Sequence, residues 1–378
     1  MIVEIWESRC LMRRYDERET LFSRVALQKG TKEYQAFYQK NPELRKIDDK
    51  FRGHSFRDAL RGSQYFKDVY MPLIKQNKAY IKQVFFAGYD ELVATKRVDL
   101  SDEFVDQLKE ITKHFGATDV GLAKLTDYEY YSHLGGLSNE LGFDTYGEEV
   151  RPKYKTAIVF TIEMDKEMIN RAPHIEELLE TERAYVALAE VSSKLTMYLK
   201  RLGYQAFGNN SEFYLGPMVP IAYDAGLGEI GIGNHLVHKK YGDRFRIGAV
   251  FTTLELPYDK PLDFGLQEFC KICALCMLNC PTKAITHKPR DVNGRTFYKF
   301  DDQACYDMWL KGGTDCGICL QSCPLSQGLD QEKVDLMKDN KDLMQKVFDE
   351  HMDKYGRRKY TKKALNIVAL KEDKDGRN

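Results

Sequence analysis

Cysteine is the residue type in this sequence whose spacing could do the most distinctive chemistry. Eight of the nine cysteines lie between positions 270 and 323, in two runs that each end in Cys-Pro. The first run, with the spacing C-x2-C-x2-C-x3-C, contains Cys270, Cys273, Cys276 and Cys280. The second, with the spacing C-x10-C-x2-C-x3-C, contains Cys305, Cys316, Cys319 and Cys323. Short spacers of this kind wrap the backbone around an iron-sulfur cubane, which takes four thiolates.

The first run has the bacterial ferredoxin spacing, in which three cysteines hold one cluster and the fourth reaches a second. The sequence therefore predicts two [4Fe-4S] clusters that can pass single electrons. By that pattern the first is held by Cys270, Cys273, Cys276 and Cys323, and the second by Cys280, Cys305, Cys316 and Cys319. Structural zinc is the competing interpretation, but zinc sites use one set of four ligands in paired C-x2-C units. We interpret the remaining Cys10 as an ordinary thiol.

Composition excludes several classes of protein. The 378 residues contain 57 Lys plus Arg and 57 Asp plus Glu, so the net charge is zero and favours neither a nucleic-acid nor a membrane-surface partner. The apolar runs, such as residues 156–162, are far shorter than a membrane span. Arg13 and Arg14 could open an export signal, but charged residues follow where an apolar region should be. We therefore expect a cytoplasmic protein, in which clustered thiols stay reduced and bind metal.

Hydrophobic periodicity predicts a layered core of strands and helices. A helix is expected from Ser101, a plausible N-cap, to Gly116, and a long helix around residues 176–202. Strands are expected near residues 119–125, 156–162, 204–207 and 246–256. We predict four regions: an N-terminal helical layer (1–95), the core (96–260), a domain with two clusters (261–330) and a C-terminal helical extension (331–378).

A glycine-rich stretch, residues 222–245, lies between the core strands and the cysteine runs. Gly226, Gly228, Gly231 and Gly233 recur too closely for a regular element, and glycine permits close backbone approach to a large ligand. The spacing is not a convincing dinucleotide fingerprint, because no acidic residue is clearly placed about 20 positions on. A structural turn and a cofactor cradle remain alternative interpretations.

The order of several motifs resembles a known family. GATDVGLAKLTDYEYYS, YKTAIVFTIEM, ERAYVALAEVSSKLTMYLKRLGYQAFGNN and AGLGEIGIGN, followed by the two cysteine runs, are similar to the corrinoid iron-sulfur proteins that include reductive dehalogenases and epoxyqueuosine reductases. The resemblance covers roughly residues 100–330, and CYDMWLKGGTDCGICLQSCP resembles the dehalogenase branch. It implies an α+β fold: a nitroreductase-like core that binds base-off cobalamin, and a C-terminal bacterial ferredoxin-type domain that delivers electrons to cobalt.

The resemblance also implies roles for individual residues. Tyr185 stands where the family has its proton-donating tyrosine, and Asn210 follows a strand where family members place polar groups near corrin or substrate. An ordinary helix aromatic and a turn asparagine are the competing interpretations. The implied cofactor contacts are Asn209, Gly226, Leu227, Gly228, Glu229, Gly231, Gly233, Asn234 and Arg246.

One position departs from the family. A basic residue that would stabilise tyrosinate or halide is expected where this sequence has Ile232. A tyrosine that acts near neutral pH needs a cation beside it to lower the pKa of its hydroxyl. The nearby candidates for a substitute cation are Lys239, Lys240, Arg244 and Arg246. Solvated surface charges or contacts to the corrinoid are the simpler interpretation of these four residues. We interpret His235 and His238 as loop residues rather than as lower cobalt ligands.

These observations predict an oxygen-sensitive, cytoplasmic reductive dehalogenase that acts on a small organohalide and receives electrons from a ferredoxin or flavodoxin-type donor. Three alternatives remain. An enzyme like epoxyqueuosine reductase would act on tRNA, which the zero net charge disfavours. The others are a corrinoid-binding or electron-transfer protein without dehalogenase activity, and a flavin enzyme on the same core.

Overall fold

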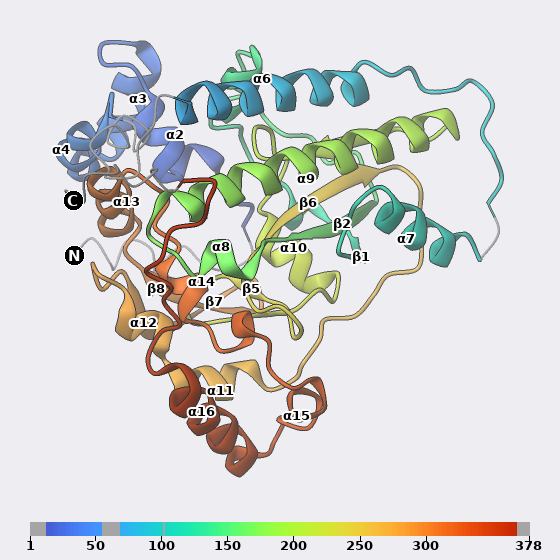
Figure 1. Ribbon diagram of the computed structural model, residues 1–378. Helices are drawn as coiled ribbons and strands as arrows, with labels where there is room; N and C mark the ends of the chain where they lie inside the picture. The colour runs from blue at the N-terminus through green and yellow to red at the C-terminus, as the bar shows by residue number, and fades with distance from the viewer. Residues whose placement is uncertain (1–12, 55–68, 101–102, 369–378) are drawn as a thin grey trace.

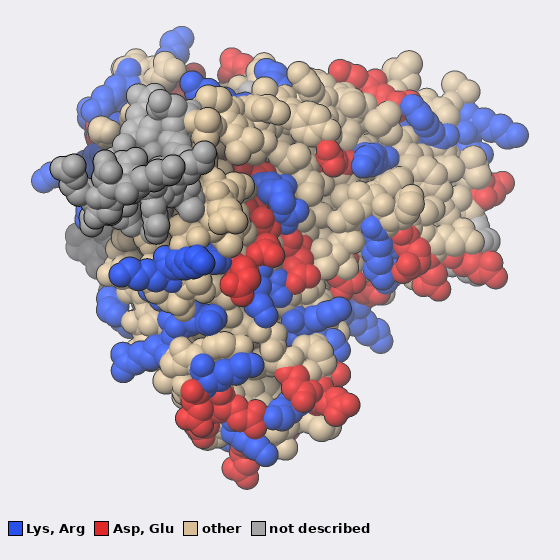
Figure 2. Space-filling model, in the orientation of Figure 1, with Lys and Arg blue, Asp and Glu red and all other residues tan. Residues whose placement is uncertain are grey.

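The computed structural model describes residues 13–54, 69–100 and 103–368; Cys10 and Ser101 lie outside these ranges. An antiparallel sheet forms the centre, with helices on both faces and the cysteine-containing segment at one end (Figure 1). Basic and acidic side chains are interspersed over the face shown in Figure 2, as zero net charge suggests. No helix within the described residues is long and apolar enough to cross a membrane.

The central sheet has the strand order β1-β2-β6-β3, and every neighbouring pair is antiparallel. Its strands are β1 (Asp119–Lys124), β2 (Thr156–Glu163), β3 (Ala206–Asn209) and β6 (Phe245–Thr252). The strands predicted at 119–125 and 156–162 are confirmed. The strand predicted to run to residue 256 ends at Thr252, because its partners end there: Thr252 pairs with Thr156 on one side and Ala206 on the other.

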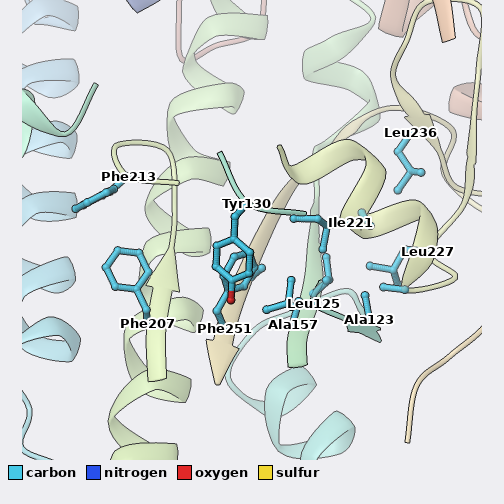
Figure 3. Close-up of a cluster of buried hydrophobic side chains, with 14 of the residues drawn as sticks. Ala123, Leu125, Tyr130, Ala157, Phe207, Phe213, Ile221, Leu227, Leu236 and Phe251 are labelled. Carbon is cyan, nitrogen blue, oxygen red and sulfur yellow. The ribbon is translucent and has the colours of Figure 1, made fainter. Parts of the chain in front are cut away.

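Alternation along β2 divides the core into two layers. Ala157 and Val159 point to the face covered by α10 (Met218–Asp224), in a cluster that includes Tyr130 and Phe251 (Figure 3). Ile158 and Phe160 point to the opposite face, against α7 (Phe104–His114) and the long α9 (Ile175–Arg201). A strand buried on both faces reads as a continuous apolar run, which is why residues 156–162 were recognisable in the sequence.

The residues described before the core contain several helices, and the predicted N-terminal helical layer at 1–95 stays a prediction. The helices are α2 (Leu21–Ala26), α3 (Lys32–Lys40), α4 (Pro42–Phe51) and α6 (Tyr70–Tyr89), and α6 lies along α9. A buried ion pair joins α2 to α4, with Arg24 Nε 2.9 Å from an Asp48 carboxylate oxygen that also accepts from the Tyr38 hydroxyl. Such a pair requires both partners, because one buried charge left alone is strongly destabilising.

The cysteine-containing segment is a set of short helices around a hairpin. It comprises α11 (Leu266–Cys273), α12 (Leu275–Asn279), β7 (Ile285–Val292), β8 (Arg295–Phe300), α13 (Asp302–Gly312) and α14 (Ile318–Ser322). The β7–β8 hairpin was not predicted. The described residues after this segment include α15 (Gln331–Asp335) and α16 (Lys341–Tyr355), and Met344 and Val347 of α16 share a buried cluster with Phe269 of α11. The α+β class is confirmed, while the four region boundaries stay a prediction.

The buried His351 of α16 should make the stability of this part depend on pH. Neither ring nitrogen has a hydrogen-bond partner among the described residues, and burial, with Lys354 contributing, lowers the pKa of His351 to about 4. The unfolded chain, with a histidine pKa near 6.5, binds this proton more readily. Stability is therefore lost as the pH falls from about 6.5 towards 4, by about 3 kcal/mol over the whole window.

Urea unfolding at pH 7 and pH 5 measures this effect. We expect His351→Leu to lose less stability than the parent between these two pH values, and His287→Leu, at an exposed position, to keep the parent's dependence. Equal losses in the parent and in His351→Leu would contradict the prediction.

Candidate functional site

The eight cysteines of the two runs come together as two sets of four. In the first set, Cys276 interacts electrostatically with Cys270, Cys273 and Cys323. In the second set, Cys305 interacts with Cys280, and Cys316 and Cys319 interact with Cys305. Cys323 of the second run thus lies with the first run, and Cys280 of the first run lies with the second. The structure brings together the residues that the sequence grouped, and their assignment as cluster ligands stays a prediction.

Burial dominates the electrostatics of these thiols. It raises the pKa of Cys270, Cys273 and Cys316 to about 12. Cys280 is different: hydrogen bonds from Thr282 and from backbone N–H groups outweigh burial and lower its pKa. Thiols that stay protonated in an apolar interior become thiolates when a metal supplies positive charge. All eight are free cysteines, so none is committed to a disulfide.

The donor set fits iron-sulfur clusters better than a single ion. Among the described residues, no group of three or more His, Cys, Asp or Glu side chains is placed to hold one metal ion. The four thiolates of a cubane bind four different irons, so they stand further apart than the ligands of one ion. Two sets of four separated thiols are what two cubanes require.

The glycine-rich stretch connects the core to the cysteine-containing segment. The Glu229 carboxylate accepts from the backbone N–H groups of Phe264 and Leu266 at 2.6 and 3.2 Å, where α11 begins. The Asn234 side chain bonds both backbone groups of Tyr298 in β8, at 2.8 and 2.9 Å. A Cβ at Gly231 would lie 3.7 Å from the Cys270 sulfur. The stretch therefore positions the first set of cysteines.

None of the predicted cofactor contacts in this stretch lines the main cavity described below. They pack within the core and, through Glu229, Gly231 and Asn234, against the cysteine-containing segment, and their binding to a cofactor stays a prediction; they are Gly226, Leu227, Gly228, Glu229, Gly231, Gly233 and Asn234. Ile232, where a basic residue was expected, is buried against Cys280, Ala284 and Tyr298. A cation at this position would lie among the cysteines.

A cavity of about 410 Å³ lies between the core and the second set of cysteines. The four thiols of that set line one side, and a cubane held by them would occupy that end. The other side is formed by side chains from α9, from β6 and from two loops of the core. The polar and aromatic residues that line the cavity as a whole include Tyr131, Glu177, Tyr185, Tyr214, His235, Arg246, Trp309 and Asp315.

Arg246 is the cation beside Tyr185. Its guanidinium carbon lies 5.3 Å from the centre of the Tyr185 ring, and it donates to the hydroxyl of Thr181 at 2.8 Å. Burial raises the pKa of the Tyr185 phenol above its ordinary value, and Arg246 acts in the opposite direction. Tyr214 also has a raised pKa, through burial and its neighbour Tyr185. The sequence named Arg246 as a candidate but could not show that it faces Tyr185.

Two carboxyl groups share the cavity wall with Arg246. Asp315 lies 3.3 Å from an Arg246 nitrogen, and Glu177 is fully buried beside it. Burial, with repulsion from Asp315, raises the pKa of Glu177 well above its usual range. Glu177 Oε2, Asp315 Oδ1 and Arg246 Nε have no hydrogen-bond partner among the described residues. These buried polar atoms belong to residues that line the cavity.

The two asparagines predicted near the site bind the backbone of the loop that follows β3. The Asn209 side-chain oxygen accepts from the Leu215 N–H at 2.8 Å, and the Asn210 oxygen accepts from the Glu212 N–H at 3.0 Å. Both are buried and shape the loop that carries Tyr214, but neither lines the main cavity. The catalytic and cofactor-binding roles assigned to them stay predictions.

Sequence reasoning missed other lining residues. Tyr131 and Tyr214 come from loops of the core, and no pattern in the sequence showed that they face the cavity. His235 lines the cavity and its Nδ1 lies 3.0 Å from Asp243, whereas His238 contacts Asp119 at 3.1 Å and stacks on Tyr241.

The fold and site define an iron-sulfur protein with a ligand cavity, and comparison with known proteins narrows this class. A family model for the 4Fe-4S dicluster domain matches residues 269–327. Tetrachloroethene reductive dehalogenase from Desulfitobacterium hafniense is 36% identical over 185 residues, which are 45% of this chain and 33% of that protein. The enzyme of the same name from Sulfurospirillum multivorans is 32% identical over 182 residues, or 46% and 36% of the two chains. The chain thus spans about a third of the length of these relatives.

A solved structure supports the same comparison at the level of fold. The catabolic reductive dehalogenase NpRdhA, in complex with 3-bromo-4-hydroxybenzoic acid, matches this structure with a TM-score of 0.69 at 20% identity. The matched region covers 92% of this chain and 47% of the NpRdhA chain. Epoxyqueuosine reductase from Synechococcus sp. is 33% identical over only 122 residues, 30% of this chain and 36% of that protein. The resemblance to reductive dehalogenases, and the α+β fold that it implied, are confirmed.

The grouping of the cysteines can be tested by pairing substitutions across the two runs. We expect Cys323→Ala to alter the same cluster as Cys273→Ala, although these residues lie in different runs, because both belong to the first set. Cys316→Ala should alter the other cluster. EPR spectra of the reduced, reconstituted variants measure this, and the parent should hold close to eight irons. A spectrum of Cys323→Ala that matches Cys316→Ala would contradict the grouping.

Proposed function

We propose that this protein is a cobalamin-dependent iron-sulfur reductive dehalogenase. The reaction consumes one organohalide, two electrons and one proton, and yields the product with a C–H bond in place of the carbon–halogen bond, together with a halide ion. One observation carries the proposal: a single cavity is lined both by the four cysteines of the second set and by Tyr185 with Arg246. Electron delivery and proton delivery therefore meet in one place.

The proposed cofactors are two [4Fe-4S] clusters and cobalamin in its base-off form. Cobalamin would supply a cobalt centre that accepts single electrons and acts on the carbon–halogen bond. The cavity fits a ligand with amide groups at its edge, because the free oxygens of Glu177 and Asp315 can accept from amide N–H donors. The cysteines of the second set line this cavity, and those of the first set lie behind them, towards α16.

Tyr185 is the proposed proton donor. Its raised pKa keeps the phenol protonated at neutral pH, so that the proton is present when the substrate arrives. Once the proton has left, the adjacent Arg246 stabilises the phenolate. Arg246 would thus perform the task that the family resemblance placed at position 232, and Asp315 and Thr181 hold its guanidinium in place.

Other parts of the proposal rest on the similar proteins. The relatives' names include tetrachloroethene, and the similar structure contains 3-bromo-4-hydroxybenzoic acid, so a small organohalide is the proposed substrate. A protein that delivers single electrons, such as a ferredoxin or flavodoxin, is the proposed donor. Function in an anaerobic cytoplasm remains an expectation.

Substitution of Tyr185 and Arg246 tests the mechanism. With protein reconstituted anaerobically with iron, sulfide and cobalamin, we expect Tyr185→Phe to lower halide release by about 10²–10⁴-fold, because it removes the proton donor but keeps the ring. Arg246→Gln should also lower the rate, because the phenolate loses its cation. Reduced methyl viologen as electron source, with tetrachloroethene and 3-bromo-4-hydroxybenzoic acid as the first two probes, gives the measurement.

Tyr198→Phe is the matched control, since Tyr198 lies on the same helix but does not line the cavity. It should keep the parent's rate, and all variants should keep their iron and cobalt. A parent protein that binds eight irons but no cobalt would contradict cobalamin dependence. If Tyr185→Phe releases halide at the parent's rate, the proton-donor role of Tyr185 is contradicted, but the proposed dehalogenation is not.

A further inference from the structure

A basic segment begins in the last turn of α16 and is bound to α12, one of the helices that carry the cysteines. Residues 354–363 contain six Lys or Arg and no Asp or Glu, in a chain whose net charge is zero. Figure 2 shows Lys and Arg side chains gathered over the part of this face where α12 and the chain after α16 lie in Figure 1. Such a local excess of one charge attracts an oppositely charged partner, although the whole molecule is neutral.

Hydrogen bonds fix the backbone of the basic segment to the helices that carry the cysteines. Asn279 of α12 donates to the Arg357 carbonyl at 2.8 Å and to the Ser322 hydroxyl at 3.0 Å. Asn279 precedes Cys280, and Ser322 precedes Cys323. At the other end, Arg171 Nε donates to the Lys363 carbonyl at 2.8 Å. The backbone is therefore held close to both cysteine sets while its charged side chains are available to a partner.

The charges of the segment are not neutralised within the molecule. Among the described residues, no carboxylate forms an ion pair with any of its six basic residues, which are Lys354, Arg357, Arg358, Lys359, Lys362 and Lys363. By contrast, Lys333 and Lys338, just before α16, each pair with a carboxylate. Three of the six, Lys354, Arg358 and Lys359, lie over aromatic rings instead, as Arg358 does over Tyr360 at 4.9 Å. Such contacts leave the positive charge exposed to a partner.

An apolar residue lies beside these cations. Leu278 of α12 is 46% exposed, two residues after Cys276 and two before Cys280. The exposed Lys283 donates to its carbonyl at 3.0 Å, and its neighbour Asn279 binds the basic segment. A small apolar contact surrounded by positive charge is suited to a brief encounter, in which charge steers the partner and little surface is buried.

We propose that the basic segment and Leu278 form the docking surface for a small acidic protein that delivers single electrons to the first-set cluster. This inference rests on the proposed function, because it assumes that electrons enter through the clusters. The position suits electron entry, since the cavity lies on the side of the second set. Exposed acidic residues on α16, Asp349 and Asp353, would repel an extended polyanion such as RNA, so a compact protein fits better.

The test measures electron transfer into the reconstituted holoprotein from a reduced acidic ferredoxin, followed by the absorbance of the clusters in stopped flow. The variant Lys354→Gln/Arg357→Gln/Lys362→Gln changes three exposed positions that carry no metal ligand. We expect the second-order rate constant at low ionic strength to fall at least ten-fold, and the difference to vanish at high salt. The same three positions changed to Glu should lower it further.

Lys113→Gln/Lys124→Gln/Lys194→Gln is the matched control, with three exposed cations removed from α7, β1 and α9. It should keep the parent's rate constant and salt dependence. Reduced methyl viologen, a small cation, should reduce the clusters of every variant no more slowly than those of the parent, which shows that the clusters are intact.

Three results would overturn the docking surface. The first is a rate constant for electron transfer in the Gln and Glu variants that equals the parent's. The second is an equal loss of rate in the control variant. The third is binding to phosphatidylglycerol vesicles that the three substitutions abolish, while electron transfer from ferredoxin is unchanged. Cluster reduction needs neither cobalamin nor halide. A protein that releases no halide but shows the expected rate pattern would therefore contradict the proposed function and leave the docking surface standing.

Discussion

The rest of the site depends on one constraint, the burial of eight cysteine thiols within one stretch of chain. Burial alone would keep most of them protonated, as the raised pKa values of Cys270 and Cys316 show. Metal binding releases those protons and supplies the charge that the interior otherwise lacks. The glycine-rich stretch contacts the first set of cysteines, and the cavity is lined by the second set. Both parts of the structure are therefore arranged around metal binding by the thiols.

The glycine-rich stretch determines where those thiols lie relative to the core. Arg244 Nε donates to the Ser326 carbonyl at 2.8 Å, and a Cβ at Gly242, where φ is +65°, would lie 2.3 Å from the Ser326 nitrogen. Only glycine tolerates both that backbone conformation and that contact. Because β6 begins directly afterwards at Phe245 and carries Arg246, the same few residues fix both the cysteine-containing segment and the cation beside Tyr185.

The sequence predicted those features that depend on local spacing. Cysteine runs and buried strands have short periods, so the two sets of thiols and β2 could be recognised before the structure was known. The pairing of Arg246 with Tyr185 could not, because it depends on how β6 packs beside α9. Glycine spacing indicated a close approach of the backbone but not to which partner: a Cβ at Gly226 would meet the Lys260 carbonyl and one at Gly228 the Val237 carbonyl, neither of which lines the cavity. The spacing also placed Ile232 where the resemblance implies a basic residue, but only the packing shows that it is buried with Cys280 and Tyr298.

The crossed arrangement of the cysteines has a consequence for how the protein is made. Cys323 lies with the first run and Cys280 lies with the second, so neither set of four is complete until nearly all of both runs has left the ribosome. Iron cannot fully load one half of the segment while the other half is still being synthesised. Cluster insertion must therefore follow translation of this whole region, and the cell has to keep eight reduced thiols unoxidised in the interval.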